Sequence, residues 1–205
     1  MANLREAQKQ MTRRLLLDAG LELFGSQGYA ATTVDEIAKA AGTTRVTFYA
    51  YFPSRSELMK ALIDEQLNER LHRTRSEVHG STAEDLVAAV ADGSREAVHG
   101  WLSRTSHTWS SIRPIIQIGR DAAAVDPELR DLVDKWLEEA ISDVEDGLAQ
   151  AGRFEPHQRH FRGVLALAQL DYVAQHWGES DWRLDREQML QELTSSWCAL
   201  VGPGE

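Results

Sequence analysis

Cysteine, proline and long apolar runs are all scarce in this chain of 205 residues. Its single cysteine, Cys198, excludes an internal disulfide framework and a zinc site built on several cysteines. No apolar run approaches the ~20 residues that a membrane-spanning helix needs, and the polar residues 1–14 do not resemble a signal peptide. We therefore expect a cytoplasmic chain that makes no membrane contact and is held together by a hydrophobic core.

Positive charge is also scarce, because 32 acidic residues outnumber 22 basic ones and give a net charge of −10. Taken over the whole chain, that charge argues against binding nucleic acid. The balance differs along the chain, however. Residues 1–60, here called the head, carry eight basic and six acidic residues, whereas residues 61–205 carry 14 and 26. The asymmetry predicts a mildly basic head that can contact DNA and an acidic body that DNA repels.

Two short helices are predicted within the head, after a longer first helix over residues 7–27. Thr33 opens a capping box, which predicts a helix over 34–41. Gly42 ends that helix, and the next helix is expected over 45–51. Two short helices joined by a tight turn form the helix-turn-helix layout, in which the second helix enters the DNA major groove.

In this layout the second short helix exposes Thr44, Arg45, Val46, Thr47 and Ala50. Arginine can form two hydrogen bonds to a guanine edge, threonine can bond a base or a phosphate, and valine or alanine can contact a thymine methyl group. The same spacing also fits two short helices in an ordinary all-α bundle, and a head charge of +2 is modest. Spacing alone leaves both interpretations open.

Residues 31–62, ATTVDEIAKAAGTTRVTFYAYFPSRSELMKAL, resemble the DNA-binding segment of the TetR family of bacterial transcriptional repressors. The matching residues stand in the family's order: Thr33-Val34, Ile37-Ala38, Ala41-Gly42, Thr47-Phe48-Tyr49, Tyr51-Phe52 and Arg55. The resemblance covers the first quarter to third of the chain. It implies an all-α fold of nine helices, with a helix-turn-helix DNA-binding domain at residues 1–55 and a ligand-binding and dimerisation domain at 56–205.

The resemblance also implies which side chains contact double-stranded operator DNA: Thr33, Thr44, Arg45, Val46, Thr47, Tyr49, Tyr51 and Arg55. Arg45, Val46 and Thr47 are expected to face bases. Tyr49 and Tyr51 are expected to reach phosphates through their hydroxyl groups. Arg55 is expected to pair with a phosphate at the start of the fourth helix, where lysine is usual in the family.

Two further features of the head concern its first helix. Gly20 replaces the alanine that is usual in the family, and a glycine inside a helix costs roughly 1 kcal/mol. Four basic residues on the N-terminal side of Gly20 form a basic arm: Arg5, Lys9, Arg13 and Arg14. This arm can reach flanking DNA, although a charged N-terminus is more often a solvated end.

No strand pattern is evident after residue 60, and helical stretches continue to the end of the chain. They are expected over residues 55–79, 81–105, 109–124, 126–150, 157–177 and 186–201. The last two helices are apolar on more than one side. The resemblance implies that they form a four-helix bundle with the same pair of a second subunit. Such a homodimer suits a palindromic operator, and the alternative is a single thick core.

The resemblance further implies a small-molecule effector, bound among the middle helices, that moves the fourth helix and releases the DNA. The candidate pocket walls are apolar and mostly aromatic: Trp101, Trp109, Ile112, Ile115, Ile116, Trp136 and Phe161. Most tryptophans at helical spacing are ordinary core residues, so that interpretation stays open for each. The effector itself is not identified by the sequence.

Catalytic and metal-binding patterns are weak. Two Glu-x-x-His pairs occur, Glu69/His72 and Glu96/His99, and such pairs hold di-iron sites in some helical bundles. Glu96 and His99 point away from the apolar stripe of their helix, which favours solvent-facing positions. No phosphate-binding loop or nucleophile elbow is present. We expect no enzyme activity, metal or cofactor; the alternative is an all-α ligand-binding or oxidative bundle protein without specific DNA binding.

Overall fold

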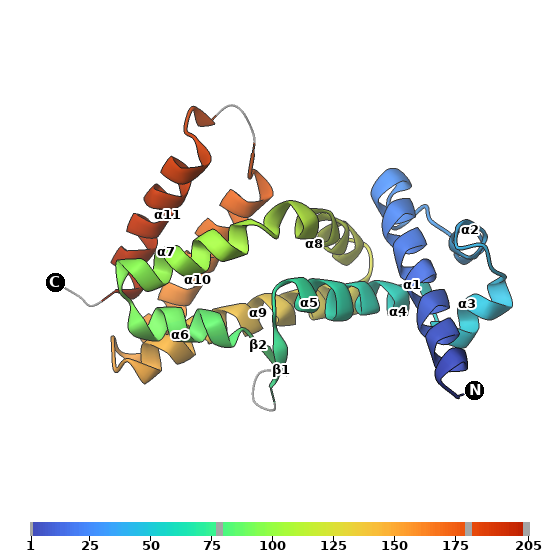
Figure 1. Ribbon diagram of the computed structural model, residues 1–205, viewed down its shortest axis with the longest axis horizontal. Coiled ribbons are helices and arrows are strands. Elements are labelled where there is room, and N and C mark those ends of the chain that lie inside the picture. Colours follow the sequence, from blue (N-terminus) through green and yellow to red (C-terminus); the bar gives the residue numbers. More distant parts are fainter. Residues whose placement is uncertain (1, 77–79, 179–181, 203–205) are drawn as a thin grey trace. The chain divides into compact units, whose positions relative to one another are not determined.

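The computed structural model describes residues 2–76, 80–178 and 182–202 (Figure 1). The chain divides into two compact units. The first comprises Met1–Glu69 with Pro114–Asp134, and the second comprises Arg70–Arg113 with Lys135–Glu205. Helices α8 (Trp109–Ala123) and α9 (Pro127–Gln150) each contribute residues to both units.

The first unit contains the head and the elements that pack on it. Its helices are α1 (Ala2–Gln27), α2 (Val34–Ala40), α3 (Arg45–Tyr51) and α4 (Arg55–Ala61). Helix α4 continues without a break as the π-helix η1 (Leu62–Leu67) and the short α5 (Asn68–Arg70). α1 packs against both α2 and α4, and α2 packs against α3 (Figure 1). The end of α8 and the start of α9 complete this unit.

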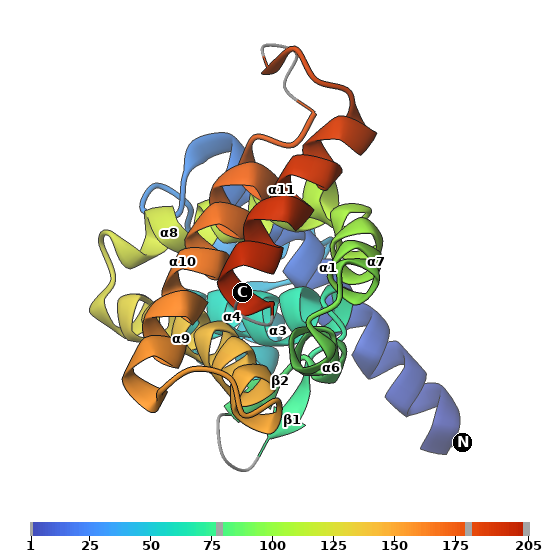
Figure 2. The same ribbon diagram turned by 90° about the vertical axis from the view of Figure 1, so that its left-hand side faces the viewer.

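The second unit begins with an antiparallel hairpin of strands β1 (Thr74–Ser76) and β2 (Gly80–Thr82), in which Thr74 pairs with Thr82. Four helices follow in addition to the parts of α8 and α9: α6 (Glu84–Asp92), α7 (Arg95–Ser106), α10 (Pro156–Gln175) and α11 (Arg186–Val201). α11 packs against α7 on one side and α10 on the other (Figure 2).

The all-α fold class is confirmed, but three local predictions differ from the structure. The helix expected over 55–79 ends at Arg70, where His72 adopts a left-handed backbone (φ 52°) and the hairpin begins. The helix expected over 81–105 is two helices, because Gly93 (φ 68°) ends α6 in the left-handed conformation. Counting α4, η1 and α5 as one, the described residues therefore form ten helices rather than nine.

The unexpected hairpin is held to α9 by a buried ion pair. Arg73 Nη1 donates to Asp143 Oδ2 at 2.7 Å, and both side chains are almost fully buried, with 3% and 0% of their surface exposed. The remaining polar atoms also have partners, since Arg73 donates to the Ser81 hydroxyl and Asp143 accepts from Thr82 and from the Ala83 N–H. A charge buried in this way is tolerated because it is paired and hydrogen-bonded.

The core of the first unit is built from apolar side chains of α1 to α4. Leu16, Ile37, Phe48 and Leu58 have no exposed surface. Gly20 explains how α1 and α4 come so close, because a Cβ atom at this position would lie 2.6 Å from Leu58 Cδ2. The cost of a glycine within α1 is thus offset by the packing that it permits. Among the described helices, none has the length and apolar character that crossing a membrane requires.

Candidate nucleic-acid interface

Helix α2 begins with the capping box that the sequence predicts. The Glu36 N–H donates to Thr33 Oγ1 at 3.3 Å, and the Thr33 N–H donates to Glu36 Oε2 at 2.8 Å. The Thr33 hydroxyl, and then its backbone N–H, hold the pKa of Glu36 below its usual value because both donate to the charged carboxylate. Thr33 is therefore fixed at the N-terminus of α2 with its surface exposed.

The turn between α2 and α3 depends on Gly42, whose φ of 67° is strained for a side-chain-bearing residue. Thr44 then caps α3 by accepting from the Thr47 N–H at 3.2 Å. Phe48 and Phe52 anchor α3 from within, since they are 0% and 2% exposed and their rings lie 5.8 Å apart.

Because Phe48 faces inward, the opposite side of α3 faces solvent. Val46 is 80% exposed and Tyr49 is 44% exposed. Arg45 and Ala50 are exposed as well, while Thr47 and Tyr51 are partly exposed. Val46 therefore lies outside the core of the head.

Arg45 is held in place by two neighbours. Its Nη1 donates to Asp35 Oδ2 of α2 at 2.9 Å, and its Nη2 donates to the Tyr49 hydroxyl at 3.3 Å. The Tyr49 hydroxyl and the charge of Asp35 raise the pKa of Arg45, so the guanidinium keeps its charge. Sequence reasoning did not pair Asp35 with Arg45. Asp35 and Arg45 are ten residues apart and lie on different helices, so no helical periodicity in the sequence indicates their contact.

Arg55 lies at the first position of α4 and is bonded within the protein. Its Nη1 donates to the Thr32 carbonyl at 2.5 Å and to the Ala30 carbonyl at 3.2 Å. The centre of the guanidinium lies 4.2 Å from the centroid of the Tyr29 ring, a cation–π contact. Arg55 therefore ties α4 to the loop between α1 and α2.

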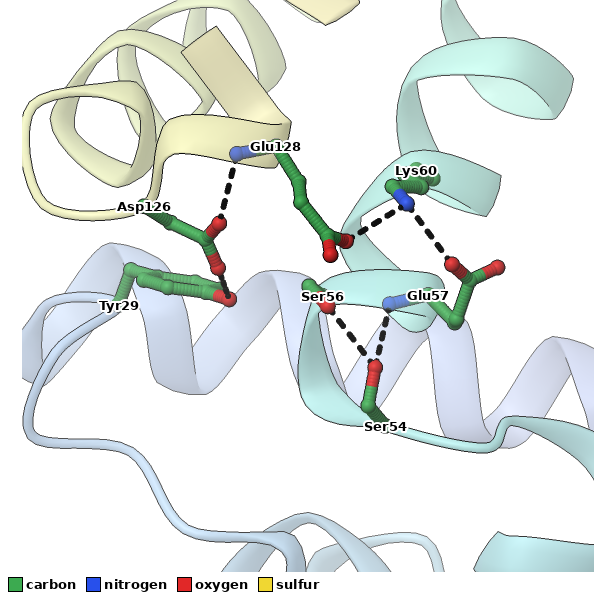
Figure 3. Close-up of polar contacts among 7 residues, drawn as sticks. All are labelled: Tyr29, Ser54, Ser56, Glu57, Lys60, Asp126 and Glu128. Carbon is green, nitrogen blue, oxygen red and sulfur yellow. Dashed lines mark hydrogen bonds and ion pairs between the residues drawn. The ribbon is translucent and has the colours of Figure 1, made fainter.

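Tyr29 and Lys60 extend this set of contacts to the start of α9 (Figure 3). The Tyr29 hydroxyl donates to Asp126 Oδ2 at 2.9 Å, and Asp126 Oδ1 accepts from the Glu128 N–H at 3.1 Å. Lys60 Nζ lies between two carboxylates, 2.8 Å from Glu57 Oε1 and 3.0 Å from Glu128 Oε2. Sequence reasoning missed this cluster because Tyr29 and Asp126 are 97 residues apart.

Burial, followed by the hydrogen bond to Asp126, raises the pKa of Tyr29 to about 12. The phenol is therefore a hydrogen-bond donor at any physiological pH. The two hydrogen bonds from Lys60 to Glu57 and Glu128 raise the pKa of Lys60 in the same direction. Under ordinary conditions the Tyr29 phenol therefore stays neutral and the Lys60 ammonium stays charged.

The four residues of the predicted basic arm occupy different environments in the structure. Arg13 forms two hydrogen bonds to Glu65 of η1, and its guanidinium lies 4.5 Å from the centroid of the Phe52 ring. Arg14 lies 4.0 Å from Asp18 and is exposed. Arg5 and Lys9 are exposed too. Arg13 thus helps to pack α1 against Phe52 and η1.

The side chains predicted to line a ligand pocket occupy different environments. Trp101 stacks on Trp197 with centroids 5.4 Å apart, and Trp109 packs edge-on against Trp177 at 4.7 Å. The remaining candidates range from buried to exposed: Ile112 (4% exposed), Ile115 (0%), Ile116 and Trp136 (both partly exposed), and Phe161 (61%). A groove of about 610 Å³ between α7 and α11 is lined by none of these residues.

The Glu-x-x-His pairs lie apart from any metal-like arrangement. His99 Nε2 lies 3.6 Å from Glu187 Oε1 at the edge of the groove between α7 and α11. In the part of the chain that the structure describes, no group of three or more histidine, cysteine, aspartate or glutamate side chains is placed to hold a metal ion.

The comparison with known proteins identifies the head. The family model for "Bacterial regulatory proteins, tetR family" matches residues 16–62. The HTH-type transcriptional regulator AcrR of Shigella flexneri is 42% identical over 62 residues, which are 30% of this chain and 29% of AcrR. The match thus spans less than a third of that relative and coincides with the helix-turn-helix segment.

Two further comparisons extend along the chain. The HTH-type transcriptional regulator EthR of Mycobacterium tuberculosis is 27% identical over 195 residues, 91% of this chain and 85% of EthR. The solved structure of the SmeT–triclosan complex shares the fold, with a TM-score of 0.65, 22% identity and coverage of 90% of both chains. Residues 16–62 thus match the TetR family of bacterial regulatory proteins, and the chain as a whole shares the fold of the SmeT structure.

Proposed function

We propose that this protein is a ligand-responsive transcriptional repressor that binds a palindromic operator as a homodimer and is released by a small molecule. The observation that carries the proposal is the exposed face of α3, where Arg45, Val46 and Tyr49 stand free of the core. A helix of this size, capped and anchored from one side, fits the DNA major groove.

The proposed contacts to DNA follow from this placement. Arg45, Val46 and Thr47 face bases, with Arg45 the residue able to bond a guanine edge. Tyr49 and Tyr51 donate their hydroxyls to phosphates. The exposed Thr33 and Thr44, each at the start of a helix, add phosphate contacts near the positive ends of α2 and α3.

A stripe on α10 supports the homodimer. Four exposed residues form this stripe: Phe161, Leu165, Ala168 and Tyr172. They follow one another at intervals of four, three and four residues, close to the 3.5-residue repeat of a coiled coil. Such spacing lets a helix pack along a second helix by knobs-into-holes contacts. Phe161 therefore fits the dimer interface better than an interior pocket. Helix α11, which packs against α10, completes the four-helix bundle that the proposal requires.

The support for a small-molecule effector comes from the similarity to SmeT and not from a cavity in this chain. SmeT, whose structure shares this fold, was solved as a complex with triclosan. The aromatic clusters around Trp101 and Trp109 are the part of this chain best suited to an apolar ligand. Effector binding would favour a conformation in which the two heads no longer match the operator.

The experiment that tests the proposal is a titration of purified protein into a duplex that it selects from a random library. A scrambled duplex serves as the comparison, and the titration is repeated over a salt series. Sequence-specific binding with a steep dependence on salt supports the repressor. Weak binding of equal affinity for the two duplexes would contradict the repressor proposal and favour a helical bundle without a DNA function.

A further inference from the structure

Arg113 of α8 has a guanidinium with few partners inside the protein. Its Nη2 donates to the Trp177 carbonyl at 2.6 Å, and this is its one hydrogen bond to a described residue. Its Nε is buried and has no acceptor among the described residues. No carboxylate in the described part of the chain forms an ion pair with it. A buried donor without an acceptor is costly, so its presence needs an explanation.

Other arginines of the second unit are satisfied within the fold. Arg153 donates to four backbone carbonyls at the ends of α6 and α11. Arg162 donates to two carbonyls in the last turn of α11, and its guanidinium lies 3.6 Å from the centroid of the Phe154 ring. Arg113 differs from both, because it keeps its charge and most of its five N–H donors for a partner from outside the chain.

The surroundings of Arg113 are aromatic. Trp109 lies one turn before it on α8 and packs edge-on against Trp177, with ring centroids 4.7 Å apart. Both rings are almost fully buried, at 1% and 7% exposed, whereas Arg113 is partly exposed and within reach of solvent. A second guanidinium, that of Arg186, lies 5.6 Å from the centroid of the Trp177 ring. Positive charge therefore approaches Trp177 both at its carbonyl and at its ring.

We propose that the effector is an apolar organic acid, whose carboxylate pairs with Arg113 and whose apolar part lies against Trp109 and Trp177. The planar fork of a guanidinium matches the two oxygens of a carboxylate, and such charge-assisted pairs are strong. The pair also supplies the acceptor that the guanidinium lacks. Residues 61–205 carry 26 acidic and 14 basic residues, so an anion is repelled by most of this region and attracted to an arginine without a carboxylate. The inference rests on the proposed function, because it names the chemical class of the effector.

Pairs of compounds that differ in charge test the carboxylate directly: naphthoate with naphthamide, and octanoate with octanamide. Calorimetry measures their binding to full-length protein without DNA. We expect at least one acid to bind at least about 10-fold more tightly than its amide, because a hydrogen bond to a charged group contributes that much. If neither acid binds more tightly than its amide, the inference is overturned.

Arg113→Gln removes the charge and should lower the affinity for the acid to that of the amide. The affinity for the amide should change by less than about twofold, since the aromatic contact is kept. Arg113→Lys keeps a positive charge and should retain part of the preference for the acid. A merely structural role for Arg113 would instead weaken the acid and the amide alike, and that outcome overturns the inference.

Arg95→Gln is the matched control. Arg95 opens α7 in the same unit, donates to the Ser195 hydroxyl at 3.0 Å, and lines the groove between α7 and α11. The substitution removes the same charge and should leave the affinity for the acid unchanged. If Arg95→Gln lowers that affinity and Arg113→Gln does not, the acid binds in the groove and the inference is wrong.

Each variant is first shown to melt cooperatively. If Arg113→Gln does not fold, the comparison rests on melting temperature, which the acid should raise more than the amide does in wild-type protein and in Arg113→Lys. An equal rise with the acid and the amide in wild-type protein would contradict the inference.

The inference and the proposed function can fail separately. An acid that binds through Arg113 should weaken binding to the selected duplex by about 10-fold or more, and an acid that binds there without this effect is not an effector. If the protein prefers the selected duplex but no acid binds better than its amide, the inference fails and the repressor stands. If an acid binds through Arg113 but the protein shows no preference for the selected duplex, the proposed function fails while the binding site stands.

Discussion

Arg45 of α3 donates a hydrogen bond of 2.9 Å to the carboxylate of Asp35 on α2. The residue proposed to read a base is thus held by a side chain of the neighbouring helix before DNA arrives. The arrangement orients the guanidinium, because Tyr49 holds its other nitrogen. It also places a negative charge on the surface that is proposed to face DNA.

Replacing Asp35 tests what this pairing does. We expect Asp35→Ala to raise affinity for DNA in general, since a repelling charge is removed, while preference for the selected duplex falls because Arg45 is less well oriented. Competition binding against single-base variants of the duplex measures both. Asp18→Ala, which removes the carboxylate beside Arg14 on the exposed side of α1, is the control and should leave preference unchanged.

Removing Arg45 and removing the Tyr51 hydroxyl should have different consequences. Arg45→Ala should cost roughly 1–3 kcal/mol at one base position and relax preference there. Tyr51→Phe should weaken binding to all sequences alike, by about 1 kcal/mol, because a lost phosphate contact carries no base information. A base-specific effect of Tyr51→Phe in the same competition assay would contradict the assignment.

The exposed stripe of α10 predicts the behaviour of the protein without DNA. Leu165→Glu should shift the dimer to monomer in sedimentation experiments, because it places a charge at the centre of the apolar contact. Leu15→Glu changes a leucine that is similarly exposed, 46% against 37%, but lies on α1. It should leave the dimer intact. A Leu165→Glu variant that sediments as a dimer would place the interface elsewhere.

The buried pair of Arg73 and Asp143 predicts a large stability effect. Arg73→Met should lower the free energy of unfolding by about 3–5 kcal/mol, because Asp143 is left as an unpaired buried charge. Urea unfolding measures the loss, and replacing Asp143 by leucine as well should recover part of it. Arg14→Met breaks an exposed pair and should change stability by less than about 0.5 kcal/mol.

Acid should weaken the start of α2 through Glu36. Its pKa in the folded protein is below the ordinary value of 4.5, so the capping box stabilises the fold above pH 4.5 and that contribution is lost as pH falls through the lowered value. Glu36→Gln should therefore show a smaller loss of melting temperature than wild type when the pH is lowered through this range. Identical pH profiles for the two proteins would exclude the effect.

How much of this could be predicted from sequence depends on the distance between partners along the chain. The capping box at Thr33 was predicted because its two residues, Thr33 and Glu36, lie within one helical turn. The hairpin was not, because its strands are three residues long and are held by Arg73 and Asp143, 70 residues apart. The contacts of Tyr29 with Asp126 and of Arg55 with the loop carbonyls escape sequence patterns for the same reason.

The most direct test of the central claim is a fluorescence anisotropy titration that compares the selected duplex with a scrambled one at physiological salt. We predict that wild-type protein binds the selected duplex roughly 10³-fold or more tightly, and that Arg45→Ala loses a large part of this preference. Equal affinity of wild-type protein for the two duplexes would contradict the account.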